Sequence, residues 1–203
     1  MQLQDRITPS TVASVAPSVI PAVILAGGQG LRIGGDKAQV VLAGRPLWRH
    51  VYDRVAPQVA AVVVNGVGSF GSMPVIADEV AGQGPLGGVL AAMDWASRQG
   101  ATRVMTMAVD TPFLPGDLCA RLAMQVGPIV IARTDDGLHA TTALWDVSLA
   151  DDLRAALAAG ARKVTAWSET AGYAAVPFPE SVPPAFFNVN TREDLEQAEA
   201  WLA

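Results

Sequence analysis

A short apolar run that leads directly into a glycine-rich segment constrains this chain more than any other feature. The run Val19–Leu25 is typical of a buried strand, and five glycines follow within residues 27–35. Glycine lets the backbone approach a ligand closely and point several N–H groups at one anion. Arg32 and Lys37 supply the cations of this segment. The pattern therefore predicts a strand followed by a loop that holds the phosphates of a triphosphate.

Two common phosphate-binding patterns do not fit this loop. A dinucleotide fingerprint needs Gly-x-Gly-x-x-Gly, but counting from Gly28 and Gly30 the third position is Ile33. A Walker loop needs Lys directly after its second glycine, but Asp36 follows Gly35. A purely structural turn is the alternative, and the length of the loop and its two cations favour phosphate binding over it.

Strand and helix signals alternate along the rest of the chain, which is typical of a parallel sheet covered by helices. Apolar runs predict strands over residues 19–25, 60–65, 74–77, 103–109, 128–132, 141–145 and 172–176. Helical spacing predicts helices over residues 46–56, 86–98, 117–125, 148–158, 162–169 and 191–202. We therefore expect one α/β domain over residues 19–203, with a Rossmann-like, open, mostly parallel sheet and helices on both faces. Thr191 and Asp194 resemble a capping box at the start of the last helix.

Composition narrows the class of protein. The net charge of -5 argues against a general nucleic-acid-binding protein, which needs an excess of Lys and Arg. Cys119 is the single cysteine, which fits a reducing cytoplasm. Residues 1–18 lack the basic start and apolar block of a signal peptide, and we expect a flexible N-terminal extension there. No run of about 18 residues is uniformly apolar, so the sequence predicts no membrane span. Charge, cysteine content and the missing span together lead us to expect a cytoplasmic protein with no membrane or nucleic-acid partner.

Polar side chains stand where three of the predicted strands end. Asn65 closes one strand, Asp78 follows the next, and Asp110 follows the strand at 103–109. Open α/β sheets bind ligands at the carboxyl ends of their strands. A carboxylate can accept hydrogen bonds from the N1–H and the 2-amino group of guanine, whereas cytosine offers no such pair of donors. A carboxylate opposite a triphosphate loop is also well placed to hold Mg²⁺, although each of these residues alone could be an ordinary turn residue.

Several motifs together resemble the molybdenum cofactor guanylyltransferases, a family of nucleotidyltransferases with an open α/β sheet. They are Leu-Ala-Gly-Gly at 25–28, Arg32, Gly-Gly-Asp-Lys at 34–37, Gly-Arg-Pro-Leu at 44–47, Gly-Pro-Leu at 84–86 and Phe-Asn-Val-Asn-Thr at 187–191. The resemblance covers about residues 20–203. The chain departs from the family pattern at Gly30 for Ser, Gly87 for Ala, Ala140 for Pro and Arg192 for Pro.

The resemblance implies a set of site residues. It implies nucleotide contacts at Leu25, Ala26, Gly27, Gly28, Lys37, Asn65, Asp78, Gly84, Pro85, Leu86 and Asp110. It implies catalytic roles for Arg32, Lys37 and Asp110, with Asp110 as ligand of Mg²⁺ or, in its place, Mn²⁺. Weaker signals assign acceptor contacts to His139, Asn188 and Asn190. The alternatives are a structural role for His139 and capping of the last helix by the two asparagines.

The family resemblance also implies the reaction. Such an enzyme transfers GMP from GTP to molybdopterin, with or without molybdenum, and releases pyrophosphate to form molybdopterin guanine dinucleotide. Its partners would be GTP, molybdopterin and other cofactor-biosynthesis proteins or molybdoenzyme chaperones. The alternatives are a sugar-phosphate or molybdopterin cytidylyl-type nucleotidyltransferase, and a non-catalytic GTP-binding assembly subunit. Leu-Ala-Gly-Gly together with Gly-Pro-Leu favours guanine, because related cytidylyltransferases look more like Leu-Ala-Ala-Gly in the first loop.

Overall fold

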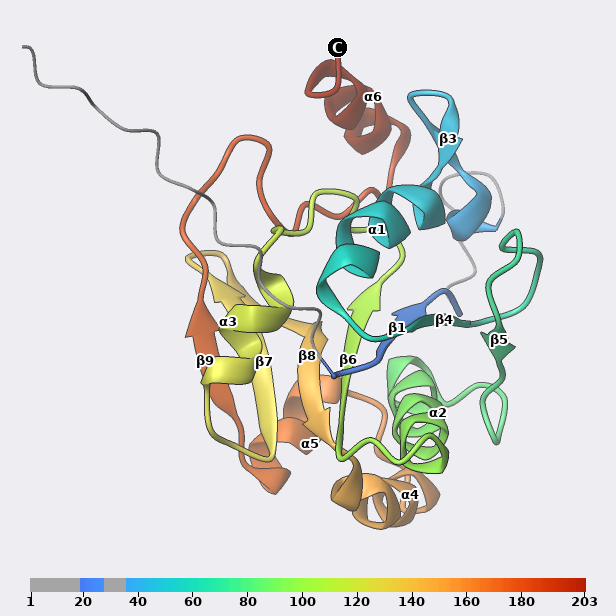
Figure 1. The fold of residues 1–203 in the computed structure, drawn as a ribbon, viewed down its shortest axis with the longest axis vertical. Coiled ribbons are helices and arrows are strands. Elements are labelled where there is room, and N and C mark those ends of the chain that lie inside the picture. Colours follow the sequence, from blue (N-terminus) through green and yellow to red (C-terminus); the bar gives the residue numbers. More distant parts are fainter. Residues whose placement is uncertain (1–18, 28–35) are drawn as a thin grey trace, which may run out of the picture.

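The structure is a computed structural model that describes residues 19–27 and 36–203. Within these residues, seven strands form one sheet in the order β5-β4-β1-β6-β8-β7-β9 (Figure 1). Strand β8 runs antiparallel to its neighbours β6 and β7, and the other pairs are parallel. The strands are β1 (Ala22–Leu25), β4 (Val62–Asn65), β5 (Val75–Ile76), β6 (Arg103–Ala108), β7 (Ile129–Thr134), β8 (Gly137–Asp146) and β9 (Ala174–Pro177).

Helices cover both faces of this sheet. They are α1 (Leu47–Val55), α2 (Pro85–Arg98), α3 (Leu118–Met124), α4 (Ala150–Ala158), α5 (Val164–Ala171) and α6 (Arg192–Ala200). Successive strand side chains point to opposite faces. Ile24 therefore packs in the core beneath α1 and α3, whereas Val23 packs in the core beneath α2, α4 and α5. Strands buried on both faces explain why they appear in the sequence as continuous apolar runs.

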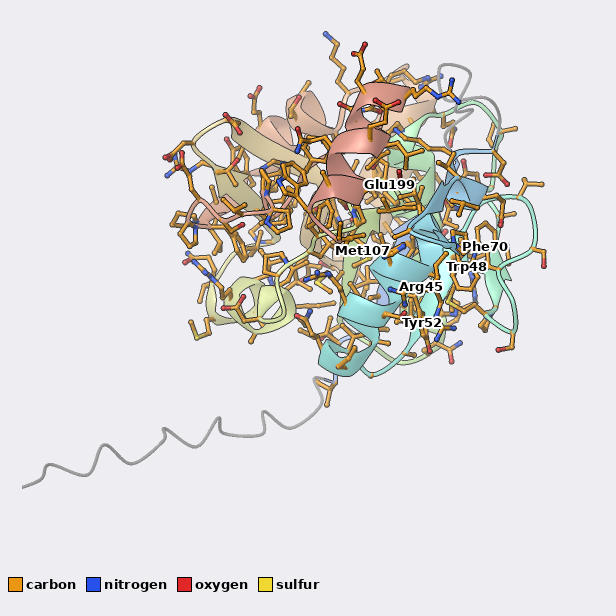
Figure 2. The ribbon with its side chains drawn as sticks, turned by 90° about the horizontal axis from the view of Figure 1, so that it is seen from above. Arg45, Trp48, Tyr52, Phe70, Met107 and Glu199 are labelled. Carbon is orange, nitrogen blue, oxygen red and sulfur yellow. The ribbon has the colours of Figure 1, made fainter. Side chains whose placement is uncertain are left out.

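A hairpin and the last helix form a smaller unit above the sheet. Strands β2 (Val41–Leu42) and β3 (Arg45–Pro46) pair antiparallel across Ala43 and Gly44, which both have positive φ, as a two-residue hairpin turn requires. Leu42 packs with residues of α6 in a third apolar cluster, and Figure 1 shows α6 beside β3. Trp48 of α1 meets Phe70 edge-on at 6.2 Å between ring centroids (Figure 2).

The predicted fold class is confirmed, and the differences lie at element boundaries and in two hairpins. The first strand begins at Ala22 rather than Val19, because Pro21 has no N–H to donate to the ladder. No pattern in the sequence predicted the hairpin β2–β3. The sequence also did not predict that β8 begins at Gly137, which makes β7 and β8 a hairpin. The expected flexible extension at residues 1–18 lies outside the described residues.

The capping box at the start of α6 is confirmed. Thr191 Oγ1 accepts a hydrogen bond from the Asp194 N–H at 3.1 Å, and Asp194 Oδ2 accepts one from the Thr191 N–H at 2.8 Å. The same oxygen accepts a bond from the Asn190 N–H at 2.8 Å. Burial by itself would raise the pKa of Asp194, but the hydrogen bonds from Asn190 and Thr191 outweigh it and hold that pKa below its ordinary value.

We expect Thr191→Ala to lower the free energy of unfolding by about 0.5–2 kcal/mol, because the substitution removes the side-chain cap of α6. Urea unfolding followed by circular dichroism measures the change. Thr102→Ala is the matched control, since the Thr102 side chain is exposed. Equal stability of the two variants would contradict a stabilising cap.

Candidate nucleotide-binding site

The site lies at the carboxyl edge of the sheet, where β1 ends between β4 and β6 (Figure 1). Leu25 is in register with Asn65 on one side and with Ala108 on the other. Beyond the strand, the Ala26 N–H donates to the Asn65 carbonyl at 2.7 Å, and the Val109 N–H donates to the Leu25 carbonyl at 3.1 Å. These bonds fix the point at which the glycine-rich segment begins.

The start of the glycine-rich segment is closely packed on one side and open on the other. A Cβ on Gly66 would lie 3.1 Å from Ala26 Cβ, so the strand ends approach each other tightly. Gly27 is exposed, and no atom of the described residues lies within 4 Å of an added Cβ. A ligand can therefore reach the backbone at Gly27. Gly28 and Arg32 lie outside the described residues, so their predicted roles stay predictions.

Lys37 joins two predicted site residues from distant parts of the chain. It begins a short 3-10 helix, η1 (Lys37–Gln39), which Asp36 caps by accepting a hydrogen bond from the Ala38 N–H at 3.1 Å. Lys37 Nζ donates to Asp110 Oδ2 and to Asn190 Oδ1. The side chains of Lys37 and Asp110 are 13% and 15% exposed. The structure thus brings together three of the residues that the sequence singled out.

One of the two carboxylate oxygens of Asp110 has no hydrogen-bond partner among the described residues. The backbone carbonyl of Asp110 accepts a bond from the Val189 N–H at 2.9 Å, which attaches the chain before α6 to the end of β6. Its Oδ2 binds Lys37, while its Oδ1 is buried and has no hydrogen-bond partner among the described residues. A buried carboxylate oxygen without a partner costs free energy unless a ligand completes it.

Asn65 and Asp78 form a second polar pair at the same edge. Asn65 is 3% exposed, and its Nδ2 donates to Asp78 Oδ1 at 2.7 Å. The segment that follows opens α2 as the sequence predicted. Gly84 caps the helix at φ +66° and Pro85 occupies its first turn. Leu86 is buried beneath the sheet, so it supports this corner of the site from within the core.

The remaining predicted residues line a cavity beside this edge. It has a volume of about 490 Å³, and its lining includes Thr134, Asp135, Asp136, His139, Phe186 and Asn188. His139 Nε2 shares a hydrogen bond with Thr134 Oγ1 at 2.8 Å, and the imidazole stacks on the Phe186 ring with 4.4 Å between the ring centroids. Burial lowers the pKa of His139, so its imidazole is neutral at pH 7. His139 and Asn188 thus share one cavity, whereas the Asn190 side chain contacts Lys37.

An ion-pair network next to Asp78 gave no signal in the sequence. Arg154 of α4 donates to Glu79 at 3.1 Å and to Asp94 of α2 at 2.9 Å. Hydrogen bonds to Glu79 and Asp94 raise the pKa of Arg154. The network ties the segment after Asp78 to the two helices. Glu79, Asp94 and Arg154 are 15, 60 and 75 positions apart, so no local pattern could have indicated that these three meet.

Known proteins resemble this chain over most of its length. The pattern of the MobA-like NTP transferase domain family matches residues 22–177. A molybdenum cofactor guanylyltransferase of Cereibacter sphaeroides is 43% identical over 89% of this chain and 95% of that protein. One of Rhizobium meliloti (strain 1021) is 43% identical over 90% of this chain and 91% of that protein. The crystal structure of molybdopterin-guanine dinucleotide biosynthesis protein A from Archaeoglobus fulgidus matches with a TM-score of 0.73 at 26% identity, over 89% of this chain and 97% of that one.

The family match, on a mostly parallel sheet whose first strand leads into a glycine-rich segment, shows that this protein is a nucleotidyltransferase. Within that class, the chain belongs to the MobA-like NTP transferase family, in the branch of the molybdenum cofactor guanylyltransferases. The family, the enzyme class and the guanylyltransferase function predicted from the sequence are therefore confirmed. The roles of single residues stay predictions. Of the helices in residues 19–27 and 36–203, each is too short or too polar to cross a membrane.

We expect Lys37→Met to lower the free energy of unfolding of the ligand-free protein by about 1–3 kcal/mol, because it leaves the Asp110 carboxylate, which is only 15% exposed, without its cation. Urea unfolding in a buffer without nucleotide or divalent metal measures the change. Lys163→Met is the matched control, since Lys163 is exposed and is the other lysine of the chain. If both variants are as stable as the unaltered protein, the Lys37–Asp110 contact contributes nothing to the ligand-free state.

Proposed function

We propose that this chain transfers GMP from GTP to the terminal phosphate of molybdopterin, releasing pyrophosphate and forming molybdopterin guanine dinucleotide. The observation that carries the proposal is the meeting of Lys37, Asp110 and Asn190 beside the start of the glycine-rich segment. Relatives named molybdenum cofactor guanylyltransferases support the choice of nucleotide and acceptor. The acceptor is molybdopterin either with or without its molybdenum.

The nucleotide would bind with its phosphates over the glycine-rich segment and its base at Asp78. Leu25 and Ala26 would contact the nucleotide, and backbone N–H groups from Gly27 onward would bind the phosphates, because the Ala26 N–H already donates to the Asn65 carbonyl. Asp78 is half-buried, and its carboxylate can accept hydrogen bonds from the N1–H and the 2-amino group of guanine. The exposed backbone at Gly84 and Pro85 leaves space for the purine at the start of α2. Cytosine would offer Asp78 no such pair of donors.

A divalent metal fits at Asp110. Its buried Oδ1, which has no hydrogen-bond partner among the described residues, is an oxygen ligand of the kind that Mg²⁺ and Mn²⁺ prefer. In proteins, Mg²⁺ commonly combines one or two carboxylates with phosphate oxygens and waters. A bound metal would neutralise negative charge on the phosphates. Asp110 would hold it, while Lys37 remains close enough to bind a phosphate oxygen as well.

The reaction requires positioning and charge neutralisation more than proton transfer. The acceptor phosphate is already anionic, so its oxygen can attack the α-phosphorus without a general base. A new P–O bond forms to the α-phosphorus, the bond to the bridging oxygen breaks, and pyrophosphate leaves with that electron pair. Lys37, Arg32 and the backbone N–H groups would stabilise the charge that develops on the phosphates.

The acceptor would lie between Asn190 and the cavity that contains His139. Asn188 lines that cavity, and two residues further along the chain Asn190 contacts Lys37. The phosphate end of the acceptor would therefore reach Lys37 and Asn190, while its ring system enters the cavity. A neutral His139 and the amide of Asn188 offer hydrogen bonds there without adding charge.

The setting of the reaction is part of the same proposal. The single cysteine, Cys119, fits a reducing compartment, and we assign the reaction to the cytoplasm. Other cofactor-biosynthesis proteins or molybdoenzyme chaperones would deliver the acceptor or receive the product.

We expect Asp110→Asn to lower turnover by about a hundredfold or more, because the amide keeps the shape of the carboxylate but loses the charge that holds the metal. Pyrophosphate release measures turnover, and calorimetry measures GTP binding, which we expect the variant to retain in part. Asp117→Asn is the control, since the Asp117 side chain is 61% exposed. Near-normal turnover by Asp110→Asn would remove the metal assignment.

A nucleotide screen separates the proposed reaction from its alternatives. We expect pyrophosphate release when the protein is incubated with GTP, Mg²⁺ and molybdopterin, and little with ATP, CTP or UTP, because only guanine presents adjacent N1–H and 2-amino donors. Preference for CTP would indicate a cytidylyltransferase. Release that requires a sugar phosphate would indicate a sugar-phosphate nucleotidyltransferase. Tight GTP binding without pyrophosphate release under any acceptor would indicate a non-catalytic assembly subunit.

A further inference from the structure

We infer that Asn65 is a positioning residue that holds Asp78 in the orientation needed to recognise guanine, and that Gly88 is a glycine because it reserves the space for the Asn65 amide. The inference rests on the proposed base-recognition role of Asp78. It differs from the prediction that Asn65 contacts the nucleotide directly.

The side-chain hydrogen bonds of Asn65 are made within the protein. Its Nδ2 donates to Asp78 Oδ1 at 2.7 Å and to the Ile76 carbonyl at 3.4 Å. An amide nitrogen has two hydrogens, and these two acceptors use both of them. The opposite orientation of the amide would place its oxygen against a carboxylate, so the hydrogen-bond network assigns the nitrogen to Asp78. Asn65 is 3% exposed, which leaves it little surface for a ligand.

The bond from Asn65 restricts the carboxylate of Asp78. Asp78 is half-buried, and a carboxylate at such a position would otherwise rotate about its terminal torsion. Each carboxylate oxygen has about two lone-pair sites, so Asp78 Oδ1 can accept from Asn65 and still accept from a base. A carboxylate fixed in one plane presents both oxygens to two adjacent donors. A carboxylate that rotates presents both oxygens only part of the time, and restricting its rotation on binding costs free energy.

Gly88, on the buried face of α2, leaves room for the Asn65 amide. A Cβ at residue 88 would lie 2.4 Å from Asn65 Oδ1 and 2.9 Å from Leu25 Cδ2. A contact of 2.4 Å cannot be tolerated, so any side chain at this position displaces the amide. A Cβ at the neighbouring Gly87 would lie 3.0 Å from Asp78 Oδ2. The two glycines thus accommodate the two members of the polar pair.

Asn65 also connects the base side of the site with the phosphate side. Its backbone carbonyl accepts the hydrogen bond from Ala26 at the start of the glycine-rich segment, while its side chain holds Asp78. Its backbone position is set by the parallel ladder, in register with Leu25. Asp78 is therefore oriented relative to the same strand end from which the phosphate-binding segment departs.

GTP and ITP distinguish a positioning role from a direct contact. Inosine keeps the N1–H of guanine but lacks the 2-amino group, so it needs only one acceptor oxygen. If Asn65 orients Asp78, removing the Asn65 amide weakens the hydrogen bond from the 2-amino group of guanine to Asp78, and the preference for GTP over ITP falls. If Asn65 instead binds a part that both nucleotides share, both lose affinity equally and the preference stays.

The experiment compares kcat/KM for GTP and ITP, with molybdopterin and Mg²⁺, in the full chain and in Asn65→Ala, Gly88→Ala and Asp78→Asn. Calorimetric affinities for both nucleotides accompany the rates. We expect the unaltered protein to prefer GTP by about tenfold or more. In Asn65→Ala and Gly88→Ala we expect that ratio to fall toward the value for Asp78→Asn, mainly through KM. Gly116→Ala is the matched glycine control, because an added Cβ there meets no atom within 4 Å in the part of the chain that the structure describes.

A double variant tests the link between Gly88 and Asn65. In an Asn65→Ala background the amide is already gone, so adding Gly88→Ala should lower the GTP preference much less than it does alone. Circular dichroism confirms folding of each variant, and if Gly88→Ala does not fold, the ratio in Asn65→Ala decides the question.

The outcomes separate this inference from the proposed function. Equal losses for GTP and ITP in Asn65→Ala, with the ratio unchanged, would overturn the positioning role and leave the guanylyltransferase proposal standing. An unchanged ratio in Asp78→Asn would overturn both base recognition by Asp78 and the role inferred for Asn65. Absence of pyrophosphate release by the unaltered protein, together with GTP preference in calorimetry that is lost in Asn65→Ala, would overturn the proposed reaction and support the inference.

Discussion

The parallel pairing of β1 with β4 on one side and β6 on the other is the constraint on which the site depends. This register places the ends of three strands in one row, with Asn65, Leu25 and Ala108 side by side. Parallel strands bring their carboxyl ends to the same edge of a sheet. Residues that are far apart in the chain therefore meet there without long loops. The buried apolar strands that form the core thus also set the geometry of the polar site.

The sequence predicted the positions of the longer strands and helices better than it predicted the hairpins. Apolar runs and helical spacing are local signals, so they predicted the alternation of strands and helices and the capping box at Thr191. The hairpin β2–β3 was not predicted, because strands of two residues show no hydrophobic periodicity and Ala43 is not a typical residue for positive φ. The hairpin of β7 and β8 was not predicted either. Its two-residue turn lies at Asp135 and Asp136, and neither position is a glycine.

Contacts between distant residues were the part that local patterns could not supply. Motif resemblance indicated that Asn65, Asp78, Lys37, Asp110 and Asn190 belong to one site, but not which of them touch. Lys37 and Asn190 are 153 positions apart, and the chain before α6 brings them together by bonding to the end of β6. The pairing of Asn65 with Asp78 follows from the parallel register of β4 with β5, which requires the order of strands to be known. The ion pairs of Arg154 with Glu79 and Asp94 were not predicted for the same reason, because they join residues that are distant in the sequence.

The two carboxylates of the site have partners of different charge, and the difference matches the ligands proposed for them. Asp78 is held by a neutral amide, which leaves its full negative charge for the uncharged N–H donors of a base. Asp110 is held by a lysine, which offsets its charge at a point where anionic phosphates would bind. An uncompensated carboxylate there would repel a triphosphate, and the repulsion would be strong at a site of low exposure. In the proposed complex, Lys37 would therefore make the site compatible with phosphate, and the second oxygen of Asp110 would be the ligand of the proposed metal.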